Sequence, residues 1–377
     1  MIINTKMKRI VILLSVLFLP FFLLAQTEKT VLFLIPFFGN TYNTQEIYQI
    51  KESEDIENTS VFQLMGFWAG AQVALDEFND KHVPLNIIVK DVSNDETKLR
   101  NIMEDQSLMS KVDLIIGPFF GKQFMIAANY AKNYKIPIIN PFTSKQDILS
   151  NNPYVYKLSP SIYAEPAMIA FMLDMYPQHK LMIYADTVQD KQDYKAYSQY
   201  FRAKNIPFTL MAQNKNIVSQ LQSDKKNIVL VLSSKPAQML MLSRDLLFNA
   251  DLENLVLVVP EEWFEEKTYD VEYYSKLNLH FFSDYFVDMA DENTQVFVHK
   301  YIEKFNAPPL LKNFSFQGYD VTKYFITAIL NDMDLDRVKF NPISYRFTFD
   351  KVNDGGYENV NIQFLEVKDN EIVPVEF

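Results

Sequence analysis

The chain has 377 residues, of which 48% are hydrophobic, enough for two domains with full cores and too many for a disordered protein. Its formal net charge is −11, with no basic stripe, which argues against nucleic acid and anionic membranes as partners. It contains no cysteine, which excludes disulfides, thiolate metal sites, a cysteine nucleophile and a lipid-modified N-terminal cysteine.

Residues 1–25 have the pattern of an export signal. Three basic residues precede an apolar stretch, Ile10–Leu24, and Ala25-Gln26 is a plausible cleavage point. The apolar stretch is shorter than the roughly 20 residues of a membrane-spanning helix, and it contains Pro20. We therefore expect a protein that is soluble in the periplasm after cleavage of this signal peptide. An uncleaved membrane anchor is the alternative.

Strands and helices alternate through the first part of the chain. Apolar runs that are rich in branched residues and too short for a helix predict buried strands, and apolar stripes predict helices. The pattern is clearest over Val112–Ser144, where strand, helix and strand make a βαβ unit with parallel strands. The predicted strands are Thr30–Pro36, Leu85–Val89, Val112–Ile116, Ile136–Ile139 and Tyr154–Leu158.

The alternation starts again after Ser159-Pro160-Ser161, which predicts a second α/β lobe of similar size. Its predicted strands are Lys180–Tyr184, Phe208–Ala212, Asn227–Leu232, Leu255–Val259 and His280–Ser283. Two helices follow, over Asn293–Phe305 and Phe316–Leu330. The tail is predicted to be antiparallel, because alternating segments at Tyr345–Phe349 and Asn361–Val367 flank the turn sequence Asn353-Asp354-Gly355-Gly356.

Ligands of open α/β sheets bind beyond the carboxyl ends of the strands, so the candidate binding residues follow predicted strand ends. Aromatic walls with a few polar groups suit a small, partly apolar ligand. Core packing is the alternative role for Phe119 and Phe120, and a solvated loop acid is the alternative for Glu261. A cleft-facing Glu261 or Asp284 implies a cationic or amine-bearing ligand. The candidates are Phe38, Phe119, Phe120, Thr143 and Ser144 from the first lobe, and Asp186, Ser233, Ser234, Glu261, Trp263, Asp284 and Tyr285 from the second.

No set of residues in the sequence has the pattern of a catalytic site. The four histidines are isolated, and no GxSxG elbow, Walker loop or GxGxxG motif occurs. Asp91, Ser93 and Asp95 imitate the start of a calcium loop, but Glu96 stands where that loop needs glycine. We therefore expect no enzymatic activity, no cofactor and no metal site.

Seven stretches of the sequence occur in a characteristic order and spacing. They are Phe67–Asn79 (FWAGAQVALDEFN), Leu85–Asp91 (LNIIVKD), Asp113–Pro118 (DLIIGP), Ala127–Pro141 with its IPIINP, Tyr156–Ser161 (YKLSPS), Leu181–Asp186 (LMIYAD) and Gly318–Leu330 (GYDVTKYFITAIL). Together they resemble the type I periplasmic binding proteins of the branched-chain amino-acid-binding (Leu/Ile/Val) family, which serve ABC importers. The resemblance covers nearly the whole mature chain, and it rests on the order of the stretches, since none is specific alone.

The resemblance implies two doubly wound lobes joined by three hinge crossovers, with a small-molecule ligand trapped between the lobes and an inner-membrane ABC permease as partner. It places the crossovers near Ser159–Tyr163, Val287–Ala290 and Arg337–Pro342. The first lobe would then comprise residues 26–160 and 288–340, and the second lobe residues 161–287 and 341–377.

The sequence departs from the family where amino-acid binders hold the ligand carboxylate. Those proteins carry a serine a few positions after the Gly-Pro turn, whereas this chain has Phe119-Phe120-Gly121-Lys122. The expectation of an α-amino-acid ligand is weakened accordingly. The alternative to a solute receptor is an envelope interaction or regulatory protein that uses the fold as a docking platform, as outer-membrane activators of cell-wall synthases do.

Overall fold

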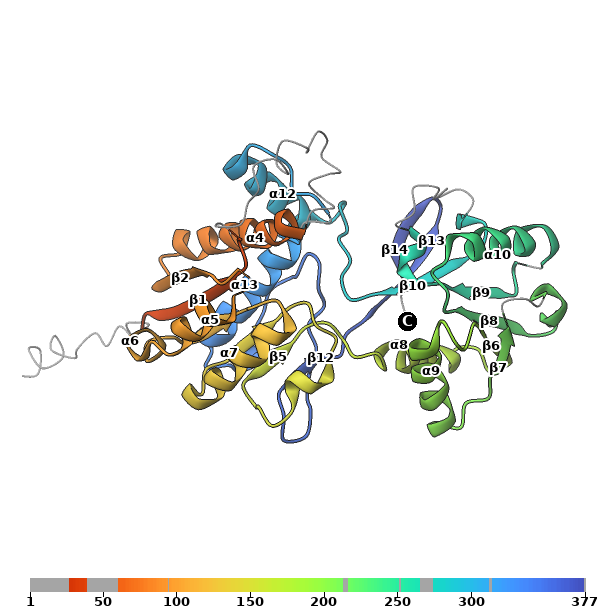
Figure 1. Ribbon diagram of the computed structural model, residues 1–377. Coiled ribbons are helices and arrows are strands. Elements are labelled where there is room, and N and C mark those ends of the chain that lie inside the picture. Colours follow the sequence, from red (N-terminus) through yellow and green to blue (C-terminus); the bar gives the residue numbers. More distant parts are fainter. Residues whose placement is uncertain are drawn as a thin grey trace, which may run out of the picture.

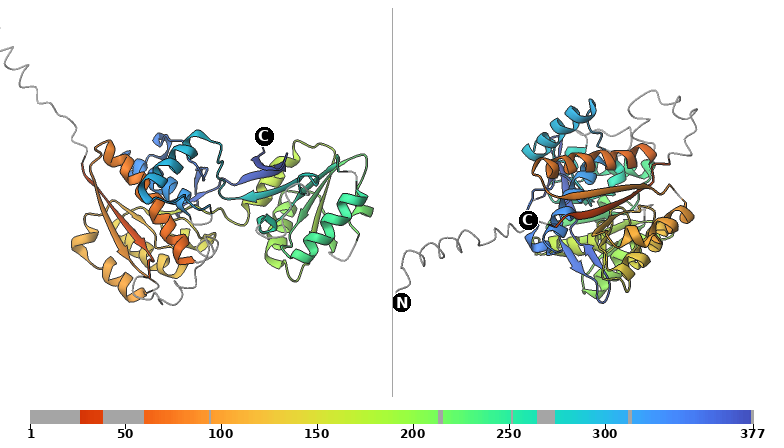
Figure 2. Two further views of the ribbon diagram at one scale, coloured as in Figure 1. Left: turned by 90° about the horizontal axis from the view of Figure 1, so that it is seen from above. Right: turned by 90° about the vertical axis from the view of Figure 1, so that its left-hand side faces the viewer.

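The computed structural model describes residues 27–38, 60–93, 95–212, 216–250, 252–264, 274–311 and 314–375. The chain forms two α/β lobes that lie side by side, each built on a seven-stranded sheet, with connecting segments running between them (Figures 1 and 2). The predicted two-lobed α/β fold is confirmed. The expected signal peptide, residues 1–25, lies outside the described residues.

The sheet of the first lobe has the strand order β2-β1-β3-β4-β5-β12-β11. Strands β1 to β5 are parallel, as their continuous apolar runs predict. The strands are β1 Lys29–Ile35, β2 Leu85–Asp91, β3 Leu114–Ile116, β4 Ile138–Asn140, β5 Val155–Lys157, β11 Phe349–Lys351 and β12 Tyr357–Asn359. The helices are α4 Ser60–Asp80, α5 Glu96–Met103, α6 Gln106–Met109, α7 Gly121–Tyr134, α12 Glu292–Phe305 and α13 Ser315–Leu330.

Helices cover both faces of this sheet. Alternate residues of β1 point to opposite faces, so Val31 and Phe33 join a core with α4 and α13, and Leu32 joins a core with α5 and α7. Helices α4 and α13 touch through two glycines. A Cβ atom at Gly70 would lie 1.7 Å from the Ser315 carbonyl oxygen, and a Cβ atom at Gly318 would lie 1.9 Å from the Phe67 carbonyl oxygen. Each helix therefore needs glycine at this position, because a side chain there would clash with the backbone of the other helix.

The sheet of the second lobe has the order β7-β6-β8-β9-β10-β13-β14, so its first five strands repeat the arrangement of β1 to β5. Helix α8, which the sequence did not predict, is apolar nearly all round and so shows no stripe. The strands are β6 His179–Ala185, β7 Thr209–Ala212, β8 Lys226–Val231, β9 Leu255–Val258, β10 Leu279–Ser283, β13 Gln363–Lys368 and β14 Glu371–Pro374. The helices are α8 Ala164–Leu173, α9 Lys191–Ala203 and α10 Pro236–Asn249, with short 3-10 turns η2 Val218–Gln220 and η3 Glu261–Phe264.

The chain crosses between the two sheets three times: between β5 and α8, between β10 and α12, and between β12 and β13. The third position corrects the prediction, which put this crossover near Arg337–Pro342 and all of 341–377 in the second lobe. Strand β12 pairs with β5 in the first sheet, where Tyr357 stacks on Tyr156 with ring centroids 4.8 Å apart. Residues up to Asn359 therefore stay with the first lobe.

The antiparallel tail is present but is divided between the lobes. Residues 352–356 join β11 to β12, and those two strands form a hairpin on the first sheet. The predicted strand over Asn361–Val367 corresponds to β13, which instead pairs antiparallel with β10 in the second sheet. The turn sequence was identified correctly. Of its two predicted partner strands, Tyr345–Phe349 coincides with β11 only at Phe349, and Asn361–Val367 belongs to the other sheet.

Candidate functional site

A cavity of about 390 Å³ lies at the carboxyl ends of β3 and β4, and we call it the aromatic pocket. Its wall includes Phe119 and Phe142, whose rings pack edge to face with centroids 5.0 Å apart. Ser159, Asp284 and Gln317 supply polar groups to the same wall. An apolar aromatic lining with a few polar groups is typical of small-molecule sites, and the volume falls in their range.

The turn after β3 sets the positions of the two adjacent phenylalanines. Gly117 has a φ of +90°, and a Cβ atom there would lie 2.4 Å from the Leu34 carbonyl oxygen, so only glycine fits against the end of β1. Phe119 then turns inward and is 5% exposed, whereas Phe120 is 37% exposed at the start of α7. Both line the aromatic pocket, and Phe38 lies beside them with its ring centroid 6.1 Å from that of Phe120.

A second cavity, of about 260 Å³, lies at the carboxyl ends of β8 and β9 in the second lobe, and we call it the acidic crevice. Four carboxylates line it, and none of the described residues that line it is basic. The Tyr197 hydroxyl donates a 2.6 Å hydrogen bond to Glu165 Oε2. Burial raises the pKa of the Glu165 carboxyl and that of the Asp193 carboxyl, and neighbouring acids add to both shifts. The crevice is thus suited to a cation or a hydrogen-bond donor. Its acids are Glu165, Asp193, Glu261 and Glu262.

A third cavity, of about 360 Å³, has walls from both lobes and adjoins the first two. It shares Phe142, Ser159 and Asp284 with the aromatic pocket. It shares Glu165 and Glu261 with the acidic crevice. The three cavities therefore follow one another along the groove between the lobes, which we call the interlobe cleft.

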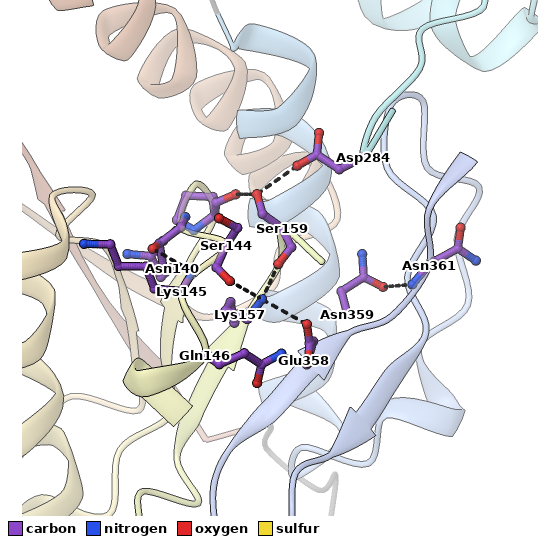
Figure 3. Close-up of polar contacts among 12 residues, drawn as sticks. Asn140, Ser144, Lys145, Gln146, Lys157, Ser159, Asp284, Glu358, Asn359 and Asn361 are labelled. Atoms are coloured by element: carbon purple, nitrogen blue, oxygen red, sulfur yellow. Dashed lines mark hydrogen bonds and ion pairs between the residues drawn. The ribbon is translucent and has the colours of Figure 1, made fainter. Parts of the chain in front are cut away.

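Asp284 stands at the centre of this cleft. Its Oδ2 accepts a 2.8 Å hydrogen bond from the Ser159 hydroxyl (Figure 3). Burial raises the pKa of the Asp284 carboxyl, and the Ser159 hydrogen bond and the Lys157 ammonium oppose that rise. The Ser159 hydroxyl and the residue's own backbone N–H both bond to this carboxylate, which lies in a partly enclosed place on the cleft wall.

A buried ion pair supports the cleft from the first lobe. Lys157 is fully buried at the end of β5, with its Nζ 3.0 Å from Glu358 Oε1 on β12. The ammonium also donates to the carbonyl oxygens of Ser144 and Ser159, and Gln146 Nε2 donates to Glu358 Oε2 at 2.6 Å (Figure 3). Burial lowers the pKa of Lys157, and Glu358 opposes this. The pair fixes the backbone of two segments that line the cleft.

Apart from Ser233 and Ser234, ten candidate residues were predicted, and the structure brings six of them to the walls of these three cavities. The 2.9 Å hydrogen bond from the Ser283 hydroxyl to Glu261 Oε1 fixes the Glu261 carboxylate at the strand end of β10. Phe38 packs beside the aromatic pocket through its contact with Phe120. The six are Phe119, Phe120, Ser144, Glu261, Asp284 and Tyr285.

Three predicted residues lie elsewhere. Trp263 is 0% exposed in the core of the second lobe, because η3 turns its ring inward and its Nε1 donates to the Ser233 carbonyl oxygen at 2.8 Å. Asp186 accepts hydrogen bonds from the backbone N–H groups of its own turn, at Val188 and Gln189. Thr143 is partly buried, and its N–H donates to Asn140 Oδ1 at 2.8 Å. None of the three lines the interlobe cleft described above. Of the two serines also proposed, Ser234 lines the acidic crevice and Ser233 is buried.

Sequence reasoning missed several residues of the cleft. Phe142 directly precedes the predicted Thr143, so the strand-end rule pointed to the right loop but to the wrong side chain. Glu165 belongs to the unpredicted helix α8. Gln317 and Tyr345 come from segments that showed only packing patterns in the sequence. Nothing local marked them, because their place depends on how α13 and the tail return to the first lobe.

Within the described ranges, no three histidine, aspartate or glutamate side chains are grouped so as to hold a metal ion. Over the same part of the chain, no helix has the length and apolar character needed to cross a bilayer.

A family model described as periplasmic binding protein matches residues 58–355. The chain belongs to the periplasmic binding protein family. The type I membership inferred from the order of short sequence stretches is confirmed. No curated protein matches this periplasmic binding protein by sequence.

Solved structures share its fold at low sequence identity. A branched-chain amino acid ABC transporter protein from Rhodospirillum rubrum is 13% identical, with a TM-score of 0.63 over 92% of this chain and 100% of that one. An ABC transporter substrate-binding protein from Desulfitobacterium hafniense, in complex with Leu, is 15% identical, with a TM-score of 0.53 over 92% and 99%. The C-domain of LpoA from Haemophilus influenzae, a regulator of PBP1A, is 13% identical, with a TM-score of 0.57 over 92% and 100%. The same architecture therefore occurs in receptors and in a regulator.

Proposed function

We propose that this periplasmic binding protein traps a small molecule between its lobes and presents it to an ABC importer of the inner membrane, without catalysing a reaction. In this proposal the protein acts in the periplasm after loss of residues 1–25. The observation that carries the proposal is the interlobe cleft, in which the aromatic pocket of one lobe and the acidic crevice of the other lie at strand carboxyl ends.

The hinge supports this proposal. In the described part of the chain, three connecting segments run between the lobes, and the first two of them are tied together by the hydrogen bond from Ser159 to Asp284 (Figures 1 and 3). Lobes connected in this way move as rigid bodies, so closing changes the compactness of the molecule and leaves its secondary structure intact. Phe120 and Tyr285 would contact the apolar part of the ligand, while Glu261 and Asp284 would accept hydrogen bonds from it.

A second function is an envelope regulator that uses the two lobes as a docking platform. Two observations favour it: the fold is shared with the LpoA C-domain, and Phe119 and Phe120 occupy the segment where amino-acid binders carry a hydroxyl. Under this alternative the cleft would hold no diffusible ligand, and an envelope protein would be the partner.

One experiment separates the two functions. The native protein is purified without denaturation, and any small molecule it retains is identified by mass spectrometry. Small-angle X-ray scattering is then recorded on the stripped protein with and without that molecule. A receptor should show a smaller radius of gyration with the ligand and unchanged circular dichroism. A protein that retains nothing, or whose radius does not change at saturation, would support the docking function.

A further inference from the structure

Gln317 is a buried amide without a hydrogen-bond partner among the described residues. It lies in the first turn of α13, is 1% exposed, and neither its Oε1 nor its Nε2 is bonded to any part of the chain that the structure describes. A buried polar group left unpaired is unfavourable, and native proteins leave few of them. Here a donor and an acceptor stand side by side, which requires an explanation.

The explanation lies in what Gln317 faces, because it lines the aromatic pocket. The other polar groups of that wall have partners in the protein: Ser159 and Asp284 bond to each other, and the Tyr345 hydroxyl donates to the Pro141 carbonyl oxygen at 3.3 Å. Gln317 is thus a residue of that wall whose amide oxygen and nitrogen both have no partner among the described residues.

The rings beside it favour a flat apolar group. Phe142 packs on Phe314 with centroids 4.5 Å apart, and Phe142 also contacts Phe119. Aromatic surfaces of this kind bind planar or apolar ligand groups, and polar groups fix their orientation.

The charges along the cleft disfavour an anion. Of the residues that the structure describes, every charged one that lines the aromatic pocket, the acidic crevice or the cavity between them is acidic, and Asp284 is the one in the aromatic pocket. A carboxylate placed against Gln317 would leave the amide oxygen facing a second acceptor, close to the acidic Asp284. A neutral group with its own adjacent donor and acceptor satisfies both atoms of the amide.

We propose that Gln317 is a specificity-determining residue that binds a carboxamide-like group of the ligand, carried on a flat apolar body that lies against the rings of the aromatic pocket. This inference rests on the proposed receptor function and names the chemical class that the site takes. It differs from recognition of an α-carboxylate, for which Gln317 offers only a neutral NH₂ group and the described wall of the pocket holds no cation.

Phenylacetamide and phenylacetate test the proposal, because they share a ring and differ in an amide against a carboxylate. Binding to the full mature protein is followed by calorimetry and by the shift in melting temperature. We expect phenylacetamide to bind and to stabilise the protein, and phenylacetate to bind at least about tenfold more weakly. Equal or tighter binding of phenylacetate, or no binding of either compound at millimolar concentration, would overturn the proposal.

Two variants of Gln317 test the role of its amide. Gln317→Leu and Gln317→Met keep the volume and remove the unpaired atoms, so the ligand-free protein should melt at the same or a higher temperature while phenylacetamide affinity falls about tenfold or more. Thr322→Val is the matched control: Thr322 lies on the same helix, is fully buried and has an unpaired hydroxyl among the described residues, but it does not line the pocket. It should leave phenylacetamide binding unchanged.

The outcomes of these variants are distinct. If both Gln317 variants melt at a lower temperature than the wild type, the amide has an internal structural partner and the proposal fails. It also fails if they bind phenylacetamide as tightly as the wild type. If the molecule retained by the native protein still closes the lobes of Gln317→Leu with unchanged affinity, this inference is overturned while the receptor function stands.

Discussion

The Ser159 hydroxyl donates a hydrogen bond of 2.8 Å to Asp284 Oδ2, and this bond joins the first crossover between the lobes to the second. Both residues also line the aromatic pocket and the cavity beside it. The contact is therefore part of the hinge and part of the cleft wall at once, so a ligand group that takes over this carboxylate would also loosen the hinge.

Ser159→Ala should destabilise the protein by about 1–3 kcal/mol, because the partly enclosed Asp284 carboxylate loses its donor. Asp284→Asn should cost less, since an amide carries no charge to desolvate. Urea unfolding followed by circular dichroism measures both. The hinge role of the pair would be contradicted if Ser159→Ala had no effect on the free energy of unfolding or on the radius of gyration.

Asp284 also predicts a pH dependence. Its pKa is raised in the folded state by burial, so the folded protein holds this proton more tightly than the unfolded chain does. That contribution to stability is fully present below the unfolded pKa of 3.8 and is lost as pH rises through the folded pKa. Asp284→Asn should remove this contribution to the pH dependence. Urea unfolding of both proteins across acidic pH would detect its loss as a changed slope of unfolding free energy against pH.

The buried Lys157–Glu358 pair should be far more sensitive to loss of one partner than to loss of both charges. Lys157→Met leaves Glu358 buried without its cation and should cost about 3–5 kcal/mol. The double variant with Glu358→Gln should recover part of that loss. Arg337→Met, which breaks the exposed 2.9 Å pair with Asp334, is the control and should cost about 1 kcal/mol or less. The prediction would be contradicted if Lys157→Met and Arg337→Met lowered the free energy of unfolding by similar amounts.

His280 should make the second lobe sensitive to acid. Its ring is 6% exposed, stacks on Phe364 with centroids 5.0 Å apart, and donates through Nδ1 to the Asn278 carbonyl oxygen. Burial lowers its pKa from 6.5 to about 4. In this pH range the unfolded chain therefore binds a proton that the folded protein does not bind. The free energy of unfolding falls as the pH drops from 6.5 through 4.

This histidine accounts for up to about 3 kcal/mol of stability between those two pH values. His280→Phe keeps the stacking on Phe364 and should flatten the acid limb of the stability curve, whatever its effect at neutral pH. Urea unfolding of both proteins at intervals across that range provides the comparison. Parallel curves for the wild type and the variant would show that His280 is not the group that titrates.

Phe119 and Phe120 are adjacent but should respond differently to truncation. Phe119→Ala removes a buried ring that packs on Phe67 and Phe142 and should cost about 3–5 kcal/mol of folding free energy. Phe120→Ala alters an exposed part of the pocket wall, so its stability should change by about 1 kcal/mol or less. Its affinity for the retained ligand should fall by roughly tenfold. Thermal melting and calorimetry on the pair decide this, and a stable Phe119→Ala would place that ring outside the core.

Much of the fold could be predicted because buried parallel strands are continuous apolar runs. The place of β12 in the first sheet could not be predicted. It depends on the stacking of Tyr357 on Tyr156, a residue about 200 positions earlier in the chain. The strand-end rule located Phe119, Phe120, Glu261 and Asp284 at the cleft. It was wrong for Trp263, because the turn that follows a strand end decides which way each side chain points. Here η3 directs the Trp263 ring into the core.

The close approach of α4 and α13 at Gly70 and Gly318 has a consequence for the order in which the protein can fold. The five parallel strands of the second lobe are encoded in one continuous stretch, residues 179–283. In the first lobe, by contrast, the apolar surface of β1 is covered by α13, a helix encoded about 250 residues after α4. A nascent chain can therefore align those five strands while its first sheet still lacks α13, and it completes the second sheet last of all, with β13 and β14 at residues 363–374. Early arrest of synthesis would leave an apolar sheet face without its cover, in a state suited to capture by chaperones.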